Sequence, residues 1–427
     1  MVARGSDTTC LMLLLNDIAY DGRVRNEART LAMAGWRVVV VCNRQYSGPL
    51  PGLLPAGVEV RRLRLLMERP AGMGRGGPLG APPFVRRLRV PGLKLLVDGV
   101  RLLDFACRVL LLTRRLQVQV VHAHDLRTLP LGALLARRLK ARLVYDAHEL
   151  FPDMTGRGRV MSRVCTWVEA RLAPRADLVL TVGAHAAQEL GRRYRLRRVA
   201  VIHNFPLSLP EEPGAGPDGQ VSDQTAEHLR RPLLVHVGGM GAGRGLDVLV
   251  RALLLARSRP ELLLVGGARR DFNRVAALYA RLGGEPSRLQ WVAPVAPEEV
   301  PSLVRSGSVG VVALENLSLN NRLALPNKLF HYLAAGLPVV ASDLPAIAEF
   351  TKQHGVGELF KSGSAEDLGE AVDRLLLDPD RWAEARRAVS RVRSEVVWEK
   401  EAPRLVQLYH DLMTGQDGNR GGSSLPA

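Results

Sequence analysis

The chain has 427 residues, 47% of them hydrophobic, a length that suits two α/β domains better than a single core. Its formal net charge is +17, with arginine supplying 53 of the 59 basic residues, and a surface of this charge favours phosphate groups, anionic lipids or nucleic acid as partners. No apolar run reaches the length of a membrane-spanning helix, so we expect a cytoplasmic protein. The cysteines at positions 10, 42, 107 and 165 have no metal-ligand or redox spacing, so we expect buried thiols in a reducing compartment.

The chain opens on a pattern typical of a parallel β-α-β unit. Residues 10–15 form an apolar run of strand length, residues 24–34 have helical periodicity and are followed by Gly35, and residues 37–42 form a second apolar run. Strands that are apolar on both faces are typical of parallel sheets covered by helices. The loop after the first strand lacks Gly-x-Gly-x-x-Gly, so the common dinucleotide-binding fingerprint is missing.

Residues 61–115 are the most basic part of the chain, with thirteen Arg or Lys residues against three acidic ones. A Gly- and Pro-rich loop at 70–83 leads to a predicted helix that begins at Leu93. The basic residues alternate with Leu, Val and Phe, a mixture that suits docking on an anionic membrane face. The alternative is a solvated helix face in a protein that is rich in arginine throughout.

Two polar clusters, at 122–125 and 146–152, directly follow predicted strands at 118–121 and 142–145. Open α/β sheets bind ligands at the carboxyl ends of their strands, so the two clusters predict a functional site. The alternative is that their His and Asp side chains satisfy loop backbone groups. No third ligand stands at metal spacing, so we expect no metal site.

Predicted strands at 177–181 and 199–202 complete the first sheet, and residues 206–230, rich in Pro, Gly and acidic residues, mark a domain boundary. The second domain begins with a strand at 233–237, and a glycine-rich turn at 238–245 follows it. Glycines between a strand and a helix let backbone N–H groups approach a diphosphate. The Arg244 guanidinium in this turn can grip a phosphate with two hydrogen bonds.

The stretch 325–343 predicts a loop, a short helix, a tight turn and a buried strand. Asn327 is the expected N-cap, and Gly336 ends the helix. Lys328 and His331 lie three residues apart, so both can project from the first turn near the positive end of the helix dipole. This predicts a phosphate cradle, and the alternative is an ordinary capped helix that leads into a strand.

The remaining pattern completes a second sheet with its helices. Further strands are predicted at 262–265, 289–292, 309–313 and 339–341, and helices at 246–256, 365–377, 380–394 and 398–413. Residues 415–427 have the composition of a disordered tail.

Four of these segments resemble the family-four glycosyltransferases, which have the GT-B fold. They are Asp-Gly-Arg-Val at 21–24, Tyr-Asp-Ala-His-Glu at 145–149, Arg-Gly at 244–245 and Pro-Asn-Lys-Leu-Phe at 326–330. They occur in the family's order, and the resemblance covers residues 9–413. It implies an α/β fold of two Rossmann-like, doubly wound parallel-sheet domains that face a cleft. The implied limits are an acceptor-side domain at 1–205, a linker at 206–230, a nucleotide-sugar domain at 231–396 and a helix at 397–414 that crosses back to the first domain.

The resemblance also implies the activity, which is sugar transfer from a nucleotide-diphosphate sugar with retention of anomeric configuration and without metal or cofactor. The implied catalytic residues are His148, Asp146 and Glu149; the donor-binding residues are Gly239, Arg244, Gly245, Asn327, Lys328, His331 and Glu349; the acceptor-side residues are Asp17, Asp21, Gly22, His124 and Asp125. The basic segment points to a glycan, lipid-linked or cell-envelope acceptor and to peripheral attachment at the inner face of the membrane.

Three positions depart from the family pattern. Leu323 and His331 stand where the family has two glutamates, and Gly239 stands where it usually has an arginine. The second glutamate of the family grips the ribose hydroxyls of the donor. A neutral imidazole accepts one hydrogen bond but offers no charged oxygens, so we expect weaker donor binding than in the family rather than none.

Two other functions fit parts of this pattern. A nucleotide-sugar epimerase of the same architecture would need acid–base carboxylates facing the sugar, and no such set can be placed. A degenerate, non-enzymatic binder of nucleotide or protein is suggested by His331 and Gly239. Nucleic-acid binding would rest on charge alone, because no recognisable motif or aromatic platform accompanies the arginines.

Overall fold

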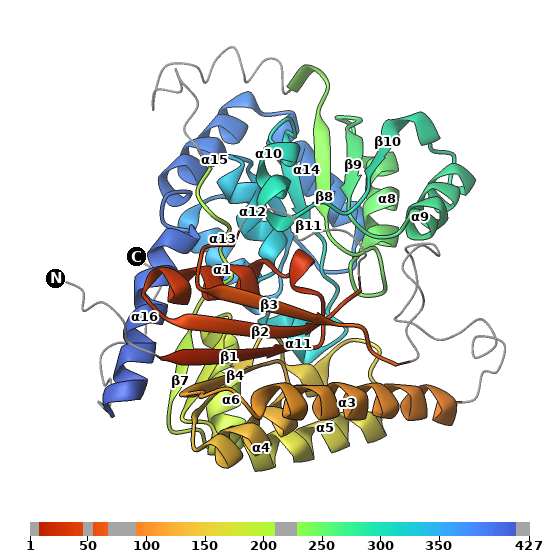
Figure 1. Cartoon of the computed structure of the whole chain (residues 1–427). Coiled ribbons are helices and arrows are strands. Elements are labelled where there is room, and N and C mark those ends of the chain that lie inside the picture. Colours follow the sequence, from red (N-terminus) through yellow and green to blue (C-terminus); the bar gives the residue numbers. More distant parts are fainter. Residues whose placement is uncertain (1–7, 46–53, 67–90, 210–228, 416–427) are drawn as a thin grey trace. The chain divides into compact units, whose positions relative to one another are not determined.

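The computed structural model describes residues 8–45, 54–66, 91–209 and 229–415 (Figure 1). The predicted loop at 70–83, the tail at 416–427 and most of the linker lie outside these residues. The chain forms two compact units. The first takes residues up to Pro152, Gly158–Ile202 and residues from Ala402 on, and the second takes Asp153–Arg157 and His203–Glu401. The last helix, α16 (Trp398–Thr414), therefore carries the chain back into the first unit.

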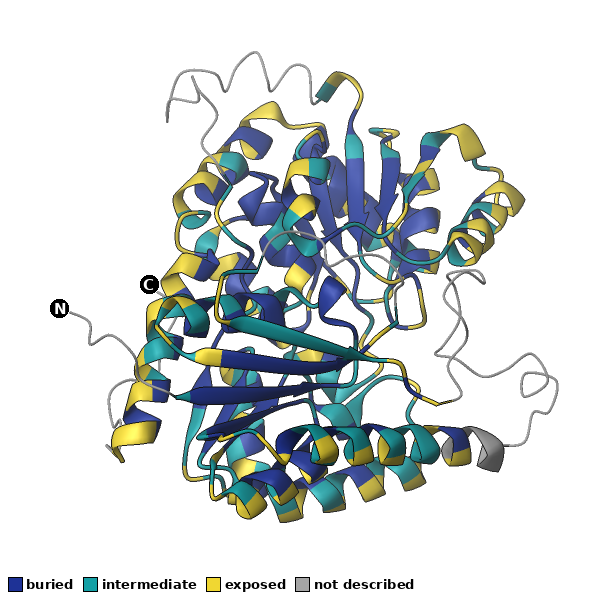
Figure 2. Cartoon of the chain, in the orientation of Figure 1, coloured by how far each residue is buried: buried dark blue, intermediate teal, exposed yellow. Residues whose placement is uncertain are grey.

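The first unit is built on a seven-stranded sheet in the order β3-β2-β1-β4-β5-β6-β7, with every pair parallel. Its strands are β1 (Thr9–Leu14), β2 (Arg37–Asn43), β3 (Val58–Leu63), β4 (Val120–His124), β5 (Arg142–Ala147), β6 (Leu178–Thr181) and β7 (Val199–Val201). Its helices are α1 (Gly22–Met33), α3 (Pro91–Thr113), α4 (Leu129–Leu139), α5 (Arg159–Leu172) and α6 (Ala184–Tyr194), together with α16. The central strands β1 and β2 are apolar runs with almost every residue buried, as strands covered on both faces are (Figure 2).

The second unit is built on a six-stranded parallel sheet in the order β10-β9-β8-β11-β12-β13. Its strands are β8 (Leu233–Val237), β9 (Glu261–Val265), β10 (Leu289–Val292), β11 (Val309–Val312), β12 (Val339–Ser342) and β13 (Gly357–Phe360). Its helices are α8 (Leu246–Leu255), α9 (Arg269–Arg281), α10 (Val300–Val304), α11 (Leu319–Leu323), α12 (Asn327–Ala334), α13 (Pro345–His354), α14 (Ala365–Leu376) and α15 (Pro379–Val392). In both sheets the strand order reverses beside the first strand, which makes each unit doubly wound.

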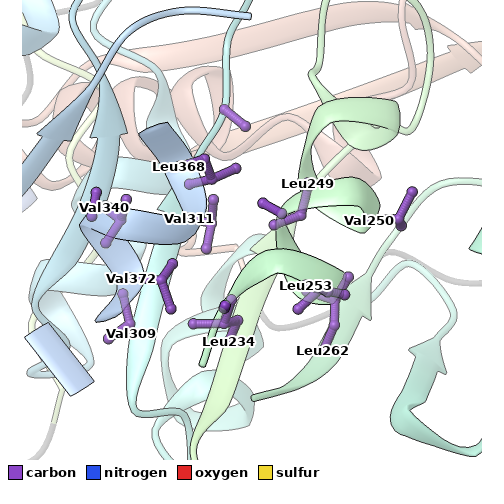
Figure 3. Close-up of a cluster of buried hydrophobic side chains, with 14 of the residues drawn as sticks. Leu234, Leu249, Val250, Leu253, Leu262, Val309, Val311, Val340, Leu368 and Val372 are labelled. Atoms are coloured by element: carbon purple, nitrogen blue, oxygen red, sulfur yellow. The ribbon is translucent and has the colours of Figure 1, made fainter. Parts of the chain in front are cut away.

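Two hydrophobic cores lie on opposite faces of the second sheet. On one face, Leu234 and Val311 of the sheet pack with side chains of α8 and α14, such as Leu249 and Leu368 (Figure 3). On the other face, Phe330 of α12 and Phe350 of α13 pack edge to face against each other, with ring centroids 5.7 Å apart. The predicted doubly wound architecture is confirmed for both units.

The structure corrects two expectations from the sequence and adds two strands to those predicted. Asn327 is the first residue of α12 rather than its N-cap, because Pro326 takes the cap position without a side-chain hydrogen bond. Cys107 is exposed, whereas the other three thiols are buried. Strands β3 and β13 were not predicted from the sequence. β3 is a half-buried edge strand whose Val-Glu-Val-Arg-Arg-Leu sequence lacks an apolar run, as edge strands often do.

None of the helices in the described ranges combines the length and apolar character that crossing a bilayer requires.

Candidate functional site

Polar side chains gather on one face of the first sheet, at the carboxyl ends of β4 and β5. His122 and His124 point to this face because they alternate along β4 with Ala123, whose side chain faces Gly132 of α4. The register pairs His124 with Asp146 of β5, which places both on the same face. The polar residues predicted to follow the strands therefore begin inside them, since β4 extends to His124 and β5 to Ala147.

A buried ion pair is the centre of this cluster. The guanidinium of Arg23, on α1, donates to both carboxylate oxygens of Asp146, with Nε–Oδ2 and Nη2–Oδ1 distances of 2.7 and 2.8 Å. It also donates to the Ile202 carbonyl at 2.5 Å, so one side chain joins α1 to β5 and to the end of the sheet. Arg23 and Asp146 are 1% and 0% exposed, which makes each the obligatory partner of the other.

His148 is joined to this pair. Its Nε2 lies 2.9 Å from Asp146 Oδ2 and 3.2 Å from His124 Nδ1. Burial opposes its charging, but the carboxylates of Asp146 and Asp125 outweigh burial and raise the pKa of His148 to about 10. The pKa of His124 is instead lowered, chiefly by burial. At neutral pH, His148 is therefore an imidazolium that donates hydrogen bonds, and His124 is neutral.

Glu27, one helical turn beyond Arg23 on α1, is fully buried beside the same pair. Its Oε1 lies 3.1 Å from Arg23 Nε, and within the described ranges neither of its oxygens has a hydrogen-bond partner. Burial, followed by repulsion from Asp146, raises the pKa of Glu27 to about 8. The side chain is thus a neutral carboxylic acid at pH 7, kept next to an ionised one.

On distance alone these residues could hold a metal ion. Single donor atoms of Glu27, His122, His124 and Asp146 lie within 4.8 Å of one another. The Arg23 guanidinium, however, already holds both oxygens of Asp146 and contacts Glu27, so a divalent cation would meet a fixed positive charge. The donor set fits a proton-sharing network better than a metal site.

Because Glu27 is protonated, we expect Glu27→Gln to stabilise the protein relative to the wild type, increasingly so as pH rises. Glutamine reproduces the neutral acid and cannot ionise. A folded-state pKa of about 8 exceeds the ordinary 4.5, so the folded protein holds a proton that the unfolded chain releases between these values. The wild type therefore loses stability as pH rises through this window, and the variant does not. The difference in unfolding free energy, variant minus wild type, should therefore increase by up to about 1.4 kcal/mol per pH unit.

Chemical denaturation at pH 5, 7 and 9 measures this gain. The matched control is Glu370→Gln, which makes the same substitution at an exposed position on α14. A Glu27→Gln curve parallel to that of the wild type would show that Glu27 is ionised throughout.

The predicted acceptor-side acids are largely occupied within the first unit. Asp17 caps a short 3-10 helix through the Ala19 N–H at 3.1 Å, and it also pairs with Arg62 at 2.6 Å. Asp21 caps α1, which begins at Gly22, through the Val24 N–H at 3.2 Å. These two carboxylates hold the loop after β1 in place. Any contact with an acceptor would fall to their remaining lone pairs.

The other two residues of the polar clusters lie in the turns after β4 and β5. Asp125 adopts a left-handed conformation with φ of 64°, and its N–H donates to the Asp146 carbonyl at 2.9 Å. Glu149 is half-buried in the turn after β5. The structure thus brings Asp125 to the Asp146–His148 pair.

The second unit has its candidate site in the loop Gly238–Gly245, between β8 and α8. Three of its glycines, Gly238, Gly243 and Gly245, have positive φ values of 107°, 79° and 68°. A Cβ at Gly245 would collide with the Ala313 carbonyl oxygen after β11, so no side chain fits there. The first turn of α8 has no side-chain cap, so its backbone N–H groups remain available for an anion. Gly239 is exposed in this loop.

Two predicted phosphate ligands, Arg244 and Lys328, lie close enough to act on each other. Lys328, at the start of α12, is 6% exposed, and its Nζ lies 3.2 Å from Nε2 of the buried His236 on β8. Burial and the positive charge of Arg244 hold the pKa of Lys328 well below its ordinary range. The half-buried Arg244 and the buried Lys328 thus place two basic groups next to the glycine loop.

The remaining predicted donor residues differ in exposure. Asn327 and Glu349 are exposed, at the start of α12 and on α13. His331 is half-buried, and within the described ranges its Nδ1 has no hydrogen-bond partner. Burial lowers its pKa to about 4, so the imidazole is neutral at physiological pH.

A neutral His331 predicts that His331→Glu lowers the Michaelis constant for the donor. A charged acceptor forms a stronger hydrogen bond to a hydroxyl than a neutral one does, by about 1 kcal/mol, which is roughly fivefold. Steady-state kinetics with varied donor measures the change. His331→Gln, which keeps a neutral acceptor, should stay near the wild-type value, and a higher Michaelis constant in His331→Glu would contradict this role.

Sequence reasoning missed several residues of these sites. In the first unit they are Arg23, Glu27 and Tyr409, whose hydroxyl lies 2.7 Å from His122 Nδ1. In the second unit it missed His236. Some signal was present, because Arg23 and Glu27 are charged residues spaced i,i+4 on an otherwise buried helix face, and His236 interrupts an apolar strand just before the glycine loop.

Comparisons with known proteins agree with this arrangement. The chain matches the family model described as "Glycosyltransferase Family 4" over residues 23–205 and the one described as "Glycosyl transferases group 1" over residues 231–378. It is 27% identical to an alpha-maltose-1-phosphate synthase of Mycolicibacterium smegmatis over 310 residues, 68% of this chain and 78% of the relative. It is 25% identical to a D-inositol 3-phosphate glycosyltransferase of Corynebacterium aurimucosum over 319 residues, 69% of this chain and 72% of the relative. The solved structure of sucrose-phosphate synthase from Thermosynechococcus elongatus superposes with a TM-score of 0.70 at 19% identity, covering 95% of this chain and all of that one.

Proposed function

Because the chain belongs to glycosyltransferase family 4, we propose that it moves a sugar from a nucleotide-diphosphate sugar to a glycan, lipid-linked or other cell-envelope acceptor. The proposal includes retention of anomeric configuration and no requirement for a metal. The observation that carries it is the pair Arg244 and Lys328 beside the glycine loop, at the switch point of the second sheet.

The second unit supplies the groups that a departing nucleotide diphosphate needs. Negative charge grows on the diphosphate as the bond to the sugar breaks. Arg244, Lys328 and the first-turn N–H groups of α8 are positioned to stabilise that charge, because all three adjoin one loop. These groups are fixed before the reaction, so little reorganisation is needed.

His148, which the family resemblance implies to be catalytic, acts in this proposal as a hydrogen-bond donor. Its imidazolium cannot stabilise a positive charge that develops on the sugar, since like charges repel. It can donate to a sugar hydroxyl while Asp146 holds the ring from the other side, at 2.9 Å. Asp146 thus orients His148 and is itself oriented by Arg23.

The proposed acceptor is anionic. The chain carries a formal charge of +17, and the synthase of Mycolicibacterium smegmatis is named for a phosphorylated product.

Helix α3 of the basic segment also exposes Leu96, Leu103 and Leu111, which are 64%, 68% and 58% accessible and lie along one stripe at helical spacing. Arg101 and Arg108 of the same helix pair with Asp98 and Asp104 at 3.9 and 2.8 Å, so attraction to an anionic membrane would come from the exposed leucines together with the net charge of the chain.

This surface predicts that the protein sediments with vesicles of anionic phospholipid at low salt and not with vesicles of phosphatidylcholine. Leu103→Glu should reduce the bound fraction severalfold, because it places a negative charge in the stripe. Leu255→Glu, at a 52% exposed leucine of the second unit, is the matched control and should bind as the wild type does. Equal loss in both variants would remove the support for docking through α3.

A thermal-shift screen with UDP, GDP, ADP and their common sugar conjugates, without added metal, tests the proposed donor class. A ligand at a hundred times its dissociation constant stabilises by about 2.7 kcal/mol, which raises the melting temperature measurably. We expect a shift with one nucleotide and its conjugates. Stabilisation by none of them would overturn the donor assignment and favour the degenerate, non-enzymatic binder.

A further inference from the structure

The contact between Lys328 and His236 places two basic nitrogens face to face in the interior of the second unit. Lys328 Nζ and His236 Nε2 are 3.2 Å apart, and the two residues are 6% and 0% exposed. A hydrogen bond between them needs one donor and one acceptor, and an ammonium facing an imidazolium offers only donors. At least one partner must therefore be unprotonated when no ligand is bound.

The surroundings determine which charges the pair can carry. Among the described residues, the charged groups that act on the pair are the two partners themselves and Arg244, which is also positive. His331, one turn along α12, is neutral. The hydroxyl oxygen of Tyr332 accepts a hydrogen bond from the Val237 N–H at 2.9 Å. With positive charge beside it and little contact with solvent, a lysine is driven toward the neutral amine. The pKa of His236 is lowered as well, by burial and by Lys328.

We propose that Lys328 and His236 form a neutral hydrogen-bonded pair in the absence of donor, and that binding of the donor diphosphate converts the Lys328 amine to an ammonium. The inference rests on the proposed function, because it needs a diphosphate at the glycine loop. Solvent supplies one proton, which adds to the Nζ lone pair, and no other bond changes. His236 is a positioning residue, which holds Nζ next to the loop that follows its own strand.

The advantage of this arrangement follows from the cost of buried charge. Two cations, Arg244 and an ammonium at Lys328, would repel each other without a counter-ion at the buried site. The neutral pair avoids that repulsion in the free protein, and the diphosphate then supplies the negative charge that makes the ammonium favourable. In this pair His236 Nε2 accepts from Nζ, so the ring proton lies on Nδ1, and the Gly239 backbone is its hydrogen-bond partner.

Isothermal titration calorimetry at pH 8 measures the proton directly. The titrant is whichever of UDP, GDP or ADP binds, in HEPES and in Tris, whose ionisation enthalpies differ. A terminal phosphate with a pKa near 6 is already deprotonated at this pH, so the ligand contributes little. We expect uptake of close to one proton per nucleotide by the wild type. Affinity should also fall as pH rises, by up to about tenfold per pH unit.

Two variants assign the proton. Lys328→Arg places a permanently charged guanidinium at the site and should bind without uptake. His236→Gln keeps a hydrogen-bonding group that does not titrate and should retain the uptake, whereas loss of uptake in this variant would assign the proton to His236 and overturn the proposal.

The wild type alone separates failure of the inference from failure of the proposed function. Nucleotide binding without proton uptake overturns the neutral pair and leaves the proposed function intact. No binding of any of the three nucleotides overturns both.

Discussion

Replacing Arg244 by alanine is expected to weaken nucleotide-diphosphate binding roughly 10- to 150-fold. A hydrogen bond to a charged group contributes about 1.5–3 kcal/mol, and a guanidinium can form two such bonds with one phosphate. Arg244 lies in the glycine loop directly before α8, where the N–H groups of the first turn face the same anion. Removing it leaves those groups and Lys328 as the remaining ligands.

Titration calorimetry with the nucleotide that the screen identifies measures this loss. Arg244→Lys should fall between the wild type and the alanine variant, because an ammonium keeps the charge but not the planar pair of donors. Arg251→Ala removes the same charge from an exposed position on α8 and should bind normally. Equal affinity in Arg244→Ala and Arg251→Ala would mean that Arg244 acts only through the net charge.

Replacing Asp146 by asparagine is expected to lower the free energy of unfolding by about 3–5 kcal/mol, the usual cost of removing one partner from a buried ion pair. Arg23 would keep its charge at 1% exposure without the carboxylate that accepts from two of its nitrogens. Arg23 and His148 lower the pKa of Asp146 despite its burial. The stability that ionised Asp146 contributes is therefore lost as pH falls below its ordinary pKa of 3.8. The pKa of His148 is raised, so the stability that its imidazolium contributes is complete only below its ordinary pKa of 6.5.

Chemical denaturation should therefore be carried out at pH 6, where both contributions are present. The pKa of His148 should fall from about 10 in the variant, which nitrogen NMR of the imidazole measures. Asp177→Asn removes the charge from a partly exposed pair with Arg142 but keeps an oxygen that can accept from the Leu143 N–H, so it should cost about 1 kcal/mol at most. An equally small cost in Asp146→Asn would mean that the Arg23 pair does not stabilise the first unit.

Glu27 gives this prediction a second test. The charge of Asp146 is one cause of the raised pKa of Glu27. Its removal should let Glu27 ionise and form the ion pair with Arg23, whose Nε lies 3.1 Å from Glu27 Oε1. The combined change of Glu27→Gln and Asp146→Asn should then cost about 0.5–3 kcal/mol more than the sum of the two single changes. Strict additivity would show that Glu27 does not compensate.

The sequence by itself determined the architecture and the family. Continuous apolar runs such as β2 mark parallel strands, because both faces of such a strand must be covered whatever its neighbours are. The glycine loop and Arg244 were found because their chemistry depends on neighbours in sequence, and the family models confirm the assignment to glycosyltransferases. Local pattern failed for Asn327, where Pro326 takes the cap position, and for the edge strand β3, which has no apolar run.

Only the tertiary structure decided how the site residues are charged. Arg23 and Asp146 are 123 residues apart, and Lys328 and His236 are 92 apart, so neither contact has a signature in local sequence. The sequence named His148 as a site residue, but its imidazolium depends on carboxylates from other elements. The neutral acid at Glu27 depends likewise on burial against Asp146. The physical reason is that composition and periodicity determine which face of an element is buried, whereas a pKa depends on the particular charges that folding brings within a few ångströms.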